Sequence, residues 1–221
     1  MKYKLMKEMI IHTCKKYLIN NIMTRKIPIE YENPIDNYLI SLCDNHIEKC
    51  IIYNISPNYI TIFRLGLSIL IIIVIYNSNY FLIPTAGFYF CYLLDCMDGH
   101  LARTTNNVTI LGDVLDHFTD IFSFSSVLLI LSIKNYEYKV YVISSLIILL
   151  FFTSMHLGLQ QKYYQSKNKE ENKEITIESL DIFTHIYDMD IKNIRWTRYF
   201  GLGTLTLFTG FAIMYMQTHS I

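Results

Sequence analysis

Four aspartates at helical spacing are the residues of this chain best suited to carry chemistry. Asp95 and Asp98 lie three residues apart, and Asp116 and Asp120 lie four apart. On a helix, either spacing puts both carboxylates on one face. The first pair ends one apolar run and the second pair begins another. We therefore expect two helix ends that meet at one membrane surface, each presenting two acids.

Carboxylates gathered at a lipid boundary cost free energy unless a positive group neutralises them, and a divalent metal is the simplest such group. The neighbours of the acids indicate what lies beside that metal. Gly112 permits close backbone approach, Ala102 is small, and Arg103 can pair with a phosphate. Gly99 directly follows an acid, and we expect it to let the chain leave its helix at positive φ. These residue types together predict a metal-bound diphosphate.

The residues from Asp95 to Asp120 follow the pattern D-x2-D-G-x2-A-R-x8-G-x3-D-x3-D. This pattern resembles the signature of the CDP-alcohol phosphotransferase family, also described as class-I CDP-alcohol phosphatidyltransferases, and the chain matches every fixed position of it. Ordinary acids at helix ends are the alternative interpretation, but acids are rare between two runs of membrane length. The resemblance implies an enzyme that passes a substituted phosphate from a CDP-linked donor to an alcohol and releases CMP.

The resemblance also implies a role for each motif residue. It makes Asp95, Asp98 and Asp116 metal ligands. Asp120 is implied to be both a ligand and the general base that deprotonates the acceptor hydroxyl. Two divalent cations, Mg²⁺ or Mn²⁺, are the implied cofactors. Contacts to the nucleotide or diphosphate are implied for Asn58, Thr61, Gly99, Ala102, Arg103, Thr109 and Gly112.

Three arginines, Arg64, Arg195 and Arg198, are candidates for contact with the acceptor. Arg64 lies one turn into the first expected span, where an unpaired charge would be costly. We therefore expect it to face a polar cavity rather than to extend outward to the headgroups. Arg195 and Arg198 flank Trp196, and interfacial anchoring explains them equally well.

The sequence leaves the acceptor open. The first interpretation is transfer of a phosphatidyl group from CDP-diacylglycerol to a small alcohol, which would be a polyol, a polyol phosphate or an amino alcohol. Residues 111–120, with His117 after Asp116, also resemble the eukaryotic choline and ethanolamine phosphotransferases. That resemblance implies the alternative of CDP-choline or CDP-ethanolamine as donor and diacylglycerol as acceptor. An inactive membrane scaffold with the same fold is a third interpretation, against which the intact four-acid motif argues.

Composition indicates a membrane protein. Hydrophobic residues make up 52% of the 221 residues, and charged residues make up 17%. The apolar residues cluster into five runs, which we expect to span the membrane at 57–76, 80–97, 114–133, 140–157 and 199–216. The predicted fold class is thus an all-α integral membrane protein with about five transmembrane helices, where the family typically has six. We expect an N-terminal membrane-surface segment, 1–56, followed by a transmembrane CDP-alcohol phosphotransferase domain, 57–221.

Amphipathic interfacial helices are expected before the first span. Residues 2–22 carry lysines and apolar residues at helical spacing, which is typical of a helix on an anionic surface, and a mitochondrial presequence is the alternative. Residues 27–34 contain two prolines and predict a linker. Asp36 is the expected N-cap of a second amphipathic helix.

The placement of lysine and arginine predicts the orientation. The N-terminal segment, an expected loop at 99–111 and an expected loop at 158–198 hold most of them, so these segments and the active site should be cytoplasmic. An endomembrane and a mitochondrial location both stay open. The expected partners are a CDP-linked lipid donor, an alcohol acceptor and membrane lipids, and a homodimer is compatible with this pattern. Equal numbers of acidic and basic residues argue against nucleic acid.

Overall fold

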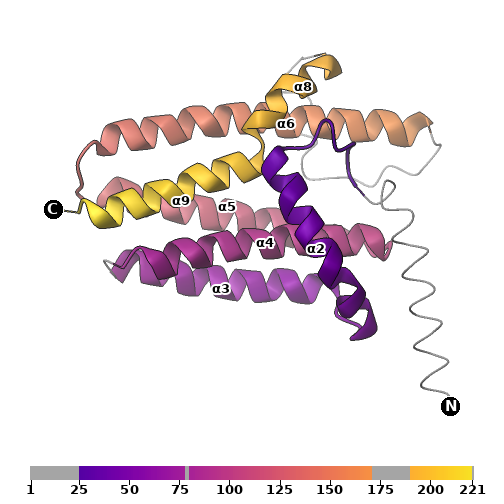
Figure 1. Ribbon diagram of the computed structural model, residues 1–221, viewed down its shortest axis with the longest axis horizontal. Coiled ribbons are helices and arrows are strands. Elements are labelled where there is room, and N and C mark those ends of the chain that lie inside the picture. The colour runs from indigo at the N-terminus through magenta and orange to yellow at the C-terminus, as the bar shows by residue number, and fades with distance from the viewer. Residues whose placement is uncertain (1–24, 78–79, 171–189, 221) are drawn as a thin grey trace.

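The computed structural model describes residues 25–77, 80–170 and 190–220, and these residues are almost entirely helical (Figure 1). The elements are α2 (Pro34–Ile52), α3 (Pro57–Asn77), α4 (Leu82–Thr104), α5 (Ile110–Ile133), α6 (Lys139–Glu170), η1 (Ile191–Asn193), α8 (Ile194–Thr197), η2 (Arg198–Phe200) and α9 (Leu202–Thr218). The prediction of an all-α protein is confirmed for this part of the chain. The helix expected at 2–22 lies outside the described residues.

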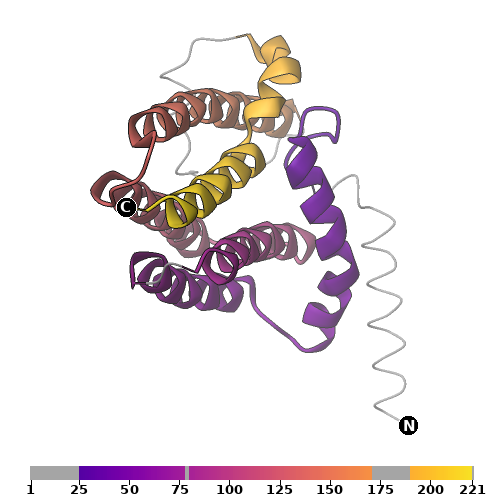
Figure 2. The ribbon, with the colours of Figure 1, turned by 60° about the vertical axis from the view of Figure 1, so that its left-hand side comes forward.

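The long helices α3, α4, α5, α6 and α9 lie side by side, and each runs between the same two ends of the bundle (Figures 1 and 2). Four segments of the described chain are long and apolar enough to cross a membrane: Pro57–Asn77, Ile110–Ile133, Lys139–Lys167 and Ile191–Thr218. The fifth expected span, α4, lies among them but is less apolar, because its second half carries Asp95 and Asp98. The chain is therefore an integral, multi-pass membrane protein.

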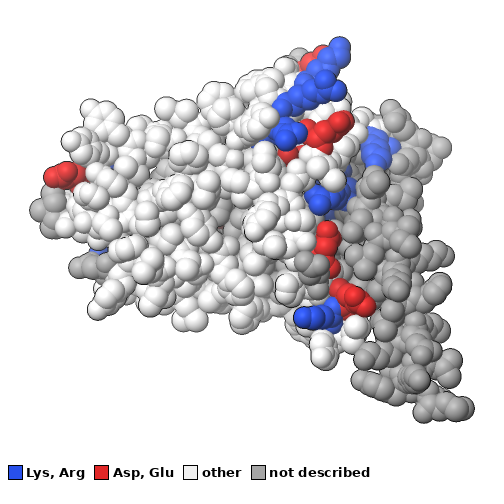
Figure 3. Space-filling view, viewed as in Figure 1, with Lys and Arg blue, Asp and Glu red and all other residues white. Residues whose placement is uncertain are grey.

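Charged side chains gather at one end of this bundle. On the face drawn in Figure 3 they lie over α2 and α8, and the long flank toward the other end is almost free of them until a small acidic patch at the tip. An apolar flank between two polar ends matches the layered structure of a bilayer.

Helix α2 lies across the charged end, where it packs on α4 and α9 (Figure 1). The Asn33 side chain caps it by accepting hydrogen bonds from the amides of Ile35 and Asp36. Pro34 follows the cap and starts the helix. The prediction that Asp36 is the N-cap is therefore wrong, because the asparagine–proline pair begins the helix earlier. Asp36 is instead buried, and the Tyr92 hydroxyl donates a 2.6 Å hydrogen bond to it.

The carboxyl group of Asp36 also lies close to α9. A Cβ added at Gly203 would collide with the Asp36 carboxylate, so a glycine is needed for this approach. Burial of Asp36, together with the nearby Glu32 carboxylate, raises its pKa to about 8. Burial also raises the pKa of Glu32. The contact between α2 and α9 is therefore sensitive to the protonation of Asp36.

The connection between α4 and α5 is shorter than the expected loop at 99–111. Helix α4 continues through Gly99 to Thr104, so the prediction that Gly99 leaves the helix at positive φ is wrong. The left-handed residue is Asn106, with φ of 54°, in the connection 105–109. The helix continues because the residue after Gly99 is tied to α2: His100 is buried, and its Nε2 lies 2.6 Å from Asp44 Oδ1.

Helix α6 is longer than the expected span at 140–157. It runs to Glu170, so the beginning of the segment expected as a loop at 158–198 is helical instead. Gln160 is buried, donates a 2.9 Å hydrogen bond to Glu32, and lies 3.0 Å from His156 Nε2. Glutamine stays helical here because the segment before α2 supplies its hydrogen-bond partner. Residues 171–189, in the same expected loop, lie outside the described part.

An apolar cluster lies beneath the helix ends that carry the acids. It is formed by Ile47 and Cys50 of α2, Ile60 of α3, and Leu94 and Leu101 of α4. Because these buried side chains exclude water, they join three helices through a shared hydrophobic contact. The cluster holds the start of α3 against the end of α4, where the acid-bearing turn must be placed.

Candidate active site

The four aspartates come together where the end of α4 meets the beginning of α5. One carboxylate oxygen from each of Asp95, Asp98 and Asp116 lies within 4.8 Å of the other two. Asp120, one turn further along α5, is joined to this cluster through Arg64. The two pairs that sequence spacing placed on helix faces thus face one another.

Arg64 of α3 is the cation among these acids. Its Nη1 donates hydrogen bonds to Oδ1 of Asp95 and, over 2.9 Å, to Oδ1 of Asp120. Its Nη2 donates to Oδ1 of Asp116 over 2.7 Å and to the carbonyl of Asp116 over 3.1 Å. The side chain is 3% exposed, so the guanidinium is almost withdrawn from water and depends on these partners. Arg64 faces the polar interior of the bundle, as its position in the first span led us to expect.

The acid cluster fits a divalent metal. Its donor atoms are carboxylate oxygens, the ligands that hard cations such as Mg²⁺ and Mn²⁺ prefer. Asp98 is buried, and the Thr61 hydroxyl donates a 2.7 Å hydrogen bond to its Oδ2, which fixes the orientation of that carboxylate. The side chains of Asp116 and Asp120 are 28% and 35% exposed, so the cluster is open to an incoming ligand on this side.

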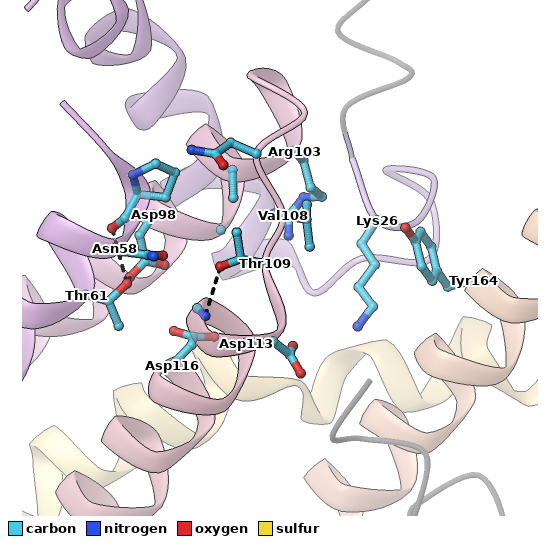
Figure 4. A pocket seen from close by; sticks show the side chains of 15 residues that line it. Lys26, Asn58, Thr61, Asp98, Arg103, Val108, Thr109, Asp113, Asp116 and Tyr164 are labelled. Atoms are coloured by element: carbon cyan, nitrogen blue, oxygen red, sulfur yellow. Dashed lines mark hydrogen bonds between the residues drawn. The ribbon is translucent and has the colours of Figure 1, made fainter. Parts of the chain in front are cut away.

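A polar cleft adjoins the acids (Figure 4). Its wall includes all seven residues that the sequence assigned to the nucleotide or diphosphate: Asn58, Thr61, Gly99, Ala102, Arg103, Thr109 and Gly112. Asp98 and Asp116 line the same cleft, so it is continuous with the acid cluster. The structure thus gathers residues of α3, α4 and α5 around one cavity that has carboxylates on one side and the Arg103 guanidinium on another.

At Gly112, α5 lies close to Asn58 of α3 at this cleft. A Cβ at this position would lie 2.7 Å from Asn58 Oδ1 and 2.9 Å from Thr109 Oγ1, which leaves no room for a side chain. The Thr109 hydroxyl accepts a 3.0 Å hydrogen bond from the Gly112 amide and caps α5. Thr109 therefore has a structural role in addition to its position in the cleft wall.

A second, mostly apolar cavity of about 340 Å³ lies on the other side of the acids, within the bundle. Its wall comes from α3, α4, α5, α6 and α9, with Phe88, Phe124 and Leu157 among its apolar residues. Arg64 and Asp120 line its polar part, and His117 lies there too. Asp120 therefore borders an apolar space, whereas Asp98 borders the polar cleft.

The three arginines proposed for the acceptor lie in different surroundings. Arg64 lines the apolar cavity, as described above. Arg195 and Arg198 line neither cavity: Arg195 lies over the Tyr31 ring at 6.0 Å, and Arg198 lies over the Tyr199 ring at 5.2 Å. Arg198 also donates a hydrogen bond to the carbonyl of Glu30. Through these contacts Arg195 and Arg198 stabilise the packing at the charged end of the bundle.

Lys26 and Tyr164 also line the polar cleft, although no motif in the sequence marks either residue. Lys26 precedes α2 and Tyr164 belongs to the extended part of α6, so both lie far from the acids in sequence. A lysine in a basic N-terminal segment looks like one of many surface charges. Local sequence could not have identified them, because only the packing of residues 25–33 against α6 brings them to the cleft.

A family model described as CDP-alcohol phosphatidyltransferase matches residues 54–215. No curated protein and no solved structure matches the chain. The family match takes in most of the chain, including both acid pairs and the helices that hold them. The chain is therefore an enzyme of the CDP-alcohol phosphatidyltransferase family.

Proposed function

We propose that this enzyme transfers a phosphatidyl group from CDP-diacylglycerol to a small alcohol and releases CMP. The observation that carries the proposal is the continuity between the polar cleft and the acid cluster. A nucleotide bound among the seven cleft residues would extend its phosphates toward Asp98 and Asp116. The partial exposure of Asp116 and Asp120 leaves a route by which a water-soluble alcohol reaches the same point.

The residues of the site suit in-line phosphoryl transfer. Asp120 would accept the proton of the acceptor hydroxyl, whose oxygen then forms a bond to the lipid-linked phosphorus. The bond from that phosphorus to the bridging oxygen of the diphosphate breaks, and the electron pair leaves with CMP. Arg103, in the cleft wall, would pair with the phosphate of the nucleotide.

The residues that would hold divalent metal are Asp95, Asp98 and Asp116, with Asp120 as the further ligand for a second ion. Mg²⁺ or Mn²⁺ bound there would neutralise the charge of the diphosphate and of the departing CMP. Thr61 keeps Asp98 oriented for this task through its 2.7 Å hydrogen bond. Arg64 holds Asp95, Asp116 and Asp120 near one another from the side of α3.

A second candidate is transfer of phosphocholine or phosphoethanolamine from its CDP derivative to diacylglycerol. The apolar cavity beside Asp120 favours it, because a lipid alcohol needs an apolar space next to the base. His117, in the segment that resembles the choline and ethanolamine enzymes, lines that cavity. In the first candidate the same space would hold part of the lipid donor.

The deciding experiment is an incubation of purified protein with Mn²⁺ and two donor sets. One set pairs labelled CDP-diacylglycerol with a panel of polyols, polyol phosphates and amino alcohols. The other pairs labelled CDP-choline or CDP-ethanolamine with diacylglycerol. Chromatography of the lipid products identifies the acceptor, and release of CMP is measured in parallel. Product from the second set alone would replace the first candidate by the second, and no product from either would support the inactive scaffold.

A further inference from the structure

The segment that precedes α2 is packed onto the rest of the protein. Ile27 is 2% exposed and forms an apolar cluster with Leu159 of α6 and Ile194 of α8. At the end of the segment, Asn33 is fully buried and donates hydrogen bonds to the carbonyl of Arg198 and the hydroxyl of Thr204. Because both ends of residues 27–33 are held in this way, the residue next to Ile27 has a defined position.

That neighbouring residue, Lys26, lies at the polar cleft. Figure 4 shows Lys26 and Tyr164 on one side of the cleft, with Asn58, Thr61 and Asp98 on the other. The Lys26 ammonium lies 5.7 Å from the centroid of the Tyr164 ring. An ammonium near an aromatic face is attracted by the ring, so Tyr164 favours the position that Lys26 occupies.

The cleft holds charges of both signs, as a metal-bound diphosphate requires. The carboxylates of Asp98 and Asp116 lie where metal would bind, and a third carboxylate, that of Asp113, lines the same cleft. Lys26 and Arg103 supply positive charge to the same cavity. A nucleoside diphosphate needs both, because the metal neutralises only part of the negative charge of its two phosphates.

We propose that Lys26 binds the phosphates of the CDP-linked donor and that Tyr164 is the residue that positions it. This inference rests on the proposed function, because it takes the polar cleft as the nucleotide site. Lys26 lies outside the range that the family model matches, residues 54–215, so the N-terminal segment adds a binding residue to the site. The ligand class is a pyrimidine nucleoside diphosphate, free or esterified to a lipid or an alcohol.

The test is isothermal titration calorimetry of the purified full-length protein with CDP in the presence of Mn²⁺, which measures the Kd for CDP. Lys26→Met should raise the Kd for CDP about fivefold, as expected for loss of one partly exposed charge-assisted contact, and Lys26→Arg should restore most of the affinity. Tyr164→Leu should weaken CDP binding less than Lys26→Met, and Tyr164→Phe should bind as wild type does. Lys49→Met is the matched control, because Lys49 is exposed on α2 and lines neither cavity.

Two further measurements separate binding from folding. The Kd for Mn²⁺ alone and the thermal unfolding midpoint should be the same in Lys26→Met, Lys49→Met and wild type. Equal affinity of Lys26→Met and Lys49→Met for CDP would overturn the assignment of Lys26 and leave the proposed function intact. A wild-type protein that does not bind CDP at all would overturn the proposed function together with this inference. Loss of CDP affinity in Lys26→Met that Lys26→Arg does not restore would also count against a phosphate contact.

Discussion

Nη1 of Arg64 lies 2.9 Å from Oδ1 of Asp120, although the two residues belong to different helices, α3 and α5. The same guanidinium contacts Asp95 and Asp116. Four carboxylates gathered at the edge of a membrane repel one another, and a buried arginine reduces that repulsion before any metal arrives. Arg64 thus keeps the acids in the arrangement that a divalent ion would require.

Replacement of Arg64 by methionine should make the fold depend on metal. Loss of one partner from a buried ion pair costs about 3–5 kcal/mol, so the unfolding midpoint should fall in the absence of divalent cations. Mn²⁺ should raise that midpoint more in Arg64→Met than in wild type, because it then supplies the positive charge that the cluster lacks. Thermal unfolding with chelator and with Mn²⁺ measures both values. Equal Mn²⁺-induced shifts in the two proteins would show that Arg64 does not neutralise the acids.

Substitution of Gly112 by alanine should impair the nucleotide cleft. The new Cβ would lie 2.7 Å from Asn58 Oδ1, so Asn58 and the capping hydroxyl of Thr109 would have to move. We expect the KM for the CDP donor to rise by about tenfold or more, the effect of losing roughly 1.4 kcal/mol of binding. Gly66→Ala is the matched control, since a Cβ there meets nothing within 4 Å. Steady-state kinetics measure the donor KM of both variants. A wild-type donor KM in Gly112→Ala as well as in Gly66→Ala would contradict this account.

Much of the candidate site could be predicted from local sequence. The spacing of the acids identifies helix faces, and the two apolar runs on either side place those faces at one boundary. The prediction that Asp95, Asp98 and Asp116 converge needed only the assumption that consecutive helices pack side by side. Arg64 was expected to face the interior because an unpaired charge in an apolar helix is costly.

The parts that could not be predicted depend on distant contacts. Gly99 stays helical because His100 is held by Asp44 of α2, and no local pattern shows that pairing. Gln160 stays helical because Glu32 accepts its hydrogen bond. Lys26 reaches the cleft because Ile27 is buried against α6 and α8. In each case a residue more than 50 positions away, or on another helix, determines the local structure.

The orientation of the bundle is a further prediction. The end that carries α2 and α8 holds most of the described lysines and arginines, and Lys134 and Lys139 lie at the other end. By the preference of positive residues for the cytoplasm, the acid cluster and the N-terminus should be cytoplasmic and the end of α9 should be on the far side. Reporter fusions at both termini measure this. A cytoplasmic C-terminus would show that α4 or another helix does not cross.

Stability should fall as pH rises, in part because of Asp36. Its pKa of about 8 in the folded protein lies above the ordinary value of 3.8, so the folded state holds a proton that the unfolded state releases. The stabilisation from this proton is fully present below about pH 4, the ordinary aspartate range, and is lost as pH rises through 8. Asp36→Asn keeps an acceptor for the Tyr92 hydroxyl and removes the titration, so its unfolding midpoint should depend less on pH.

The control for the pH series is Glu48→Gln, which removes a carboxylate from the same helix but leaves Asp36 in place. Midpoints measured from pH 5 to pH 9 should fall more steeply for wild type and Glu48→Gln than for Asp36→Asn. Identical slopes for Asp36→Asn and wild type would mean that Asp36 is ionised in the folded protein throughout this range.

Replacement of Asp120 by asparagine tests the general base. The amide cannot accept the proton of the acceptor hydroxyl, so kcat should fall by about 10²–10⁴-fold, the usual contribution of general base catalysis. The metal cluster of Asp95, Asp98 and Asp116 does not include Asp120, so the Kd for Mn²⁺ at this cluster and for CDP should change much less than kcat. Asp113→Asn makes the same chemical change two turns earlier in α5, where the acid lines the nucleotide cleft, and it should affect the donor KM more than kcat. A normal kcat for Asp120→Asn combined with an inactive Asp113→Asn would move the base by two helical turns and invalidate the assignment.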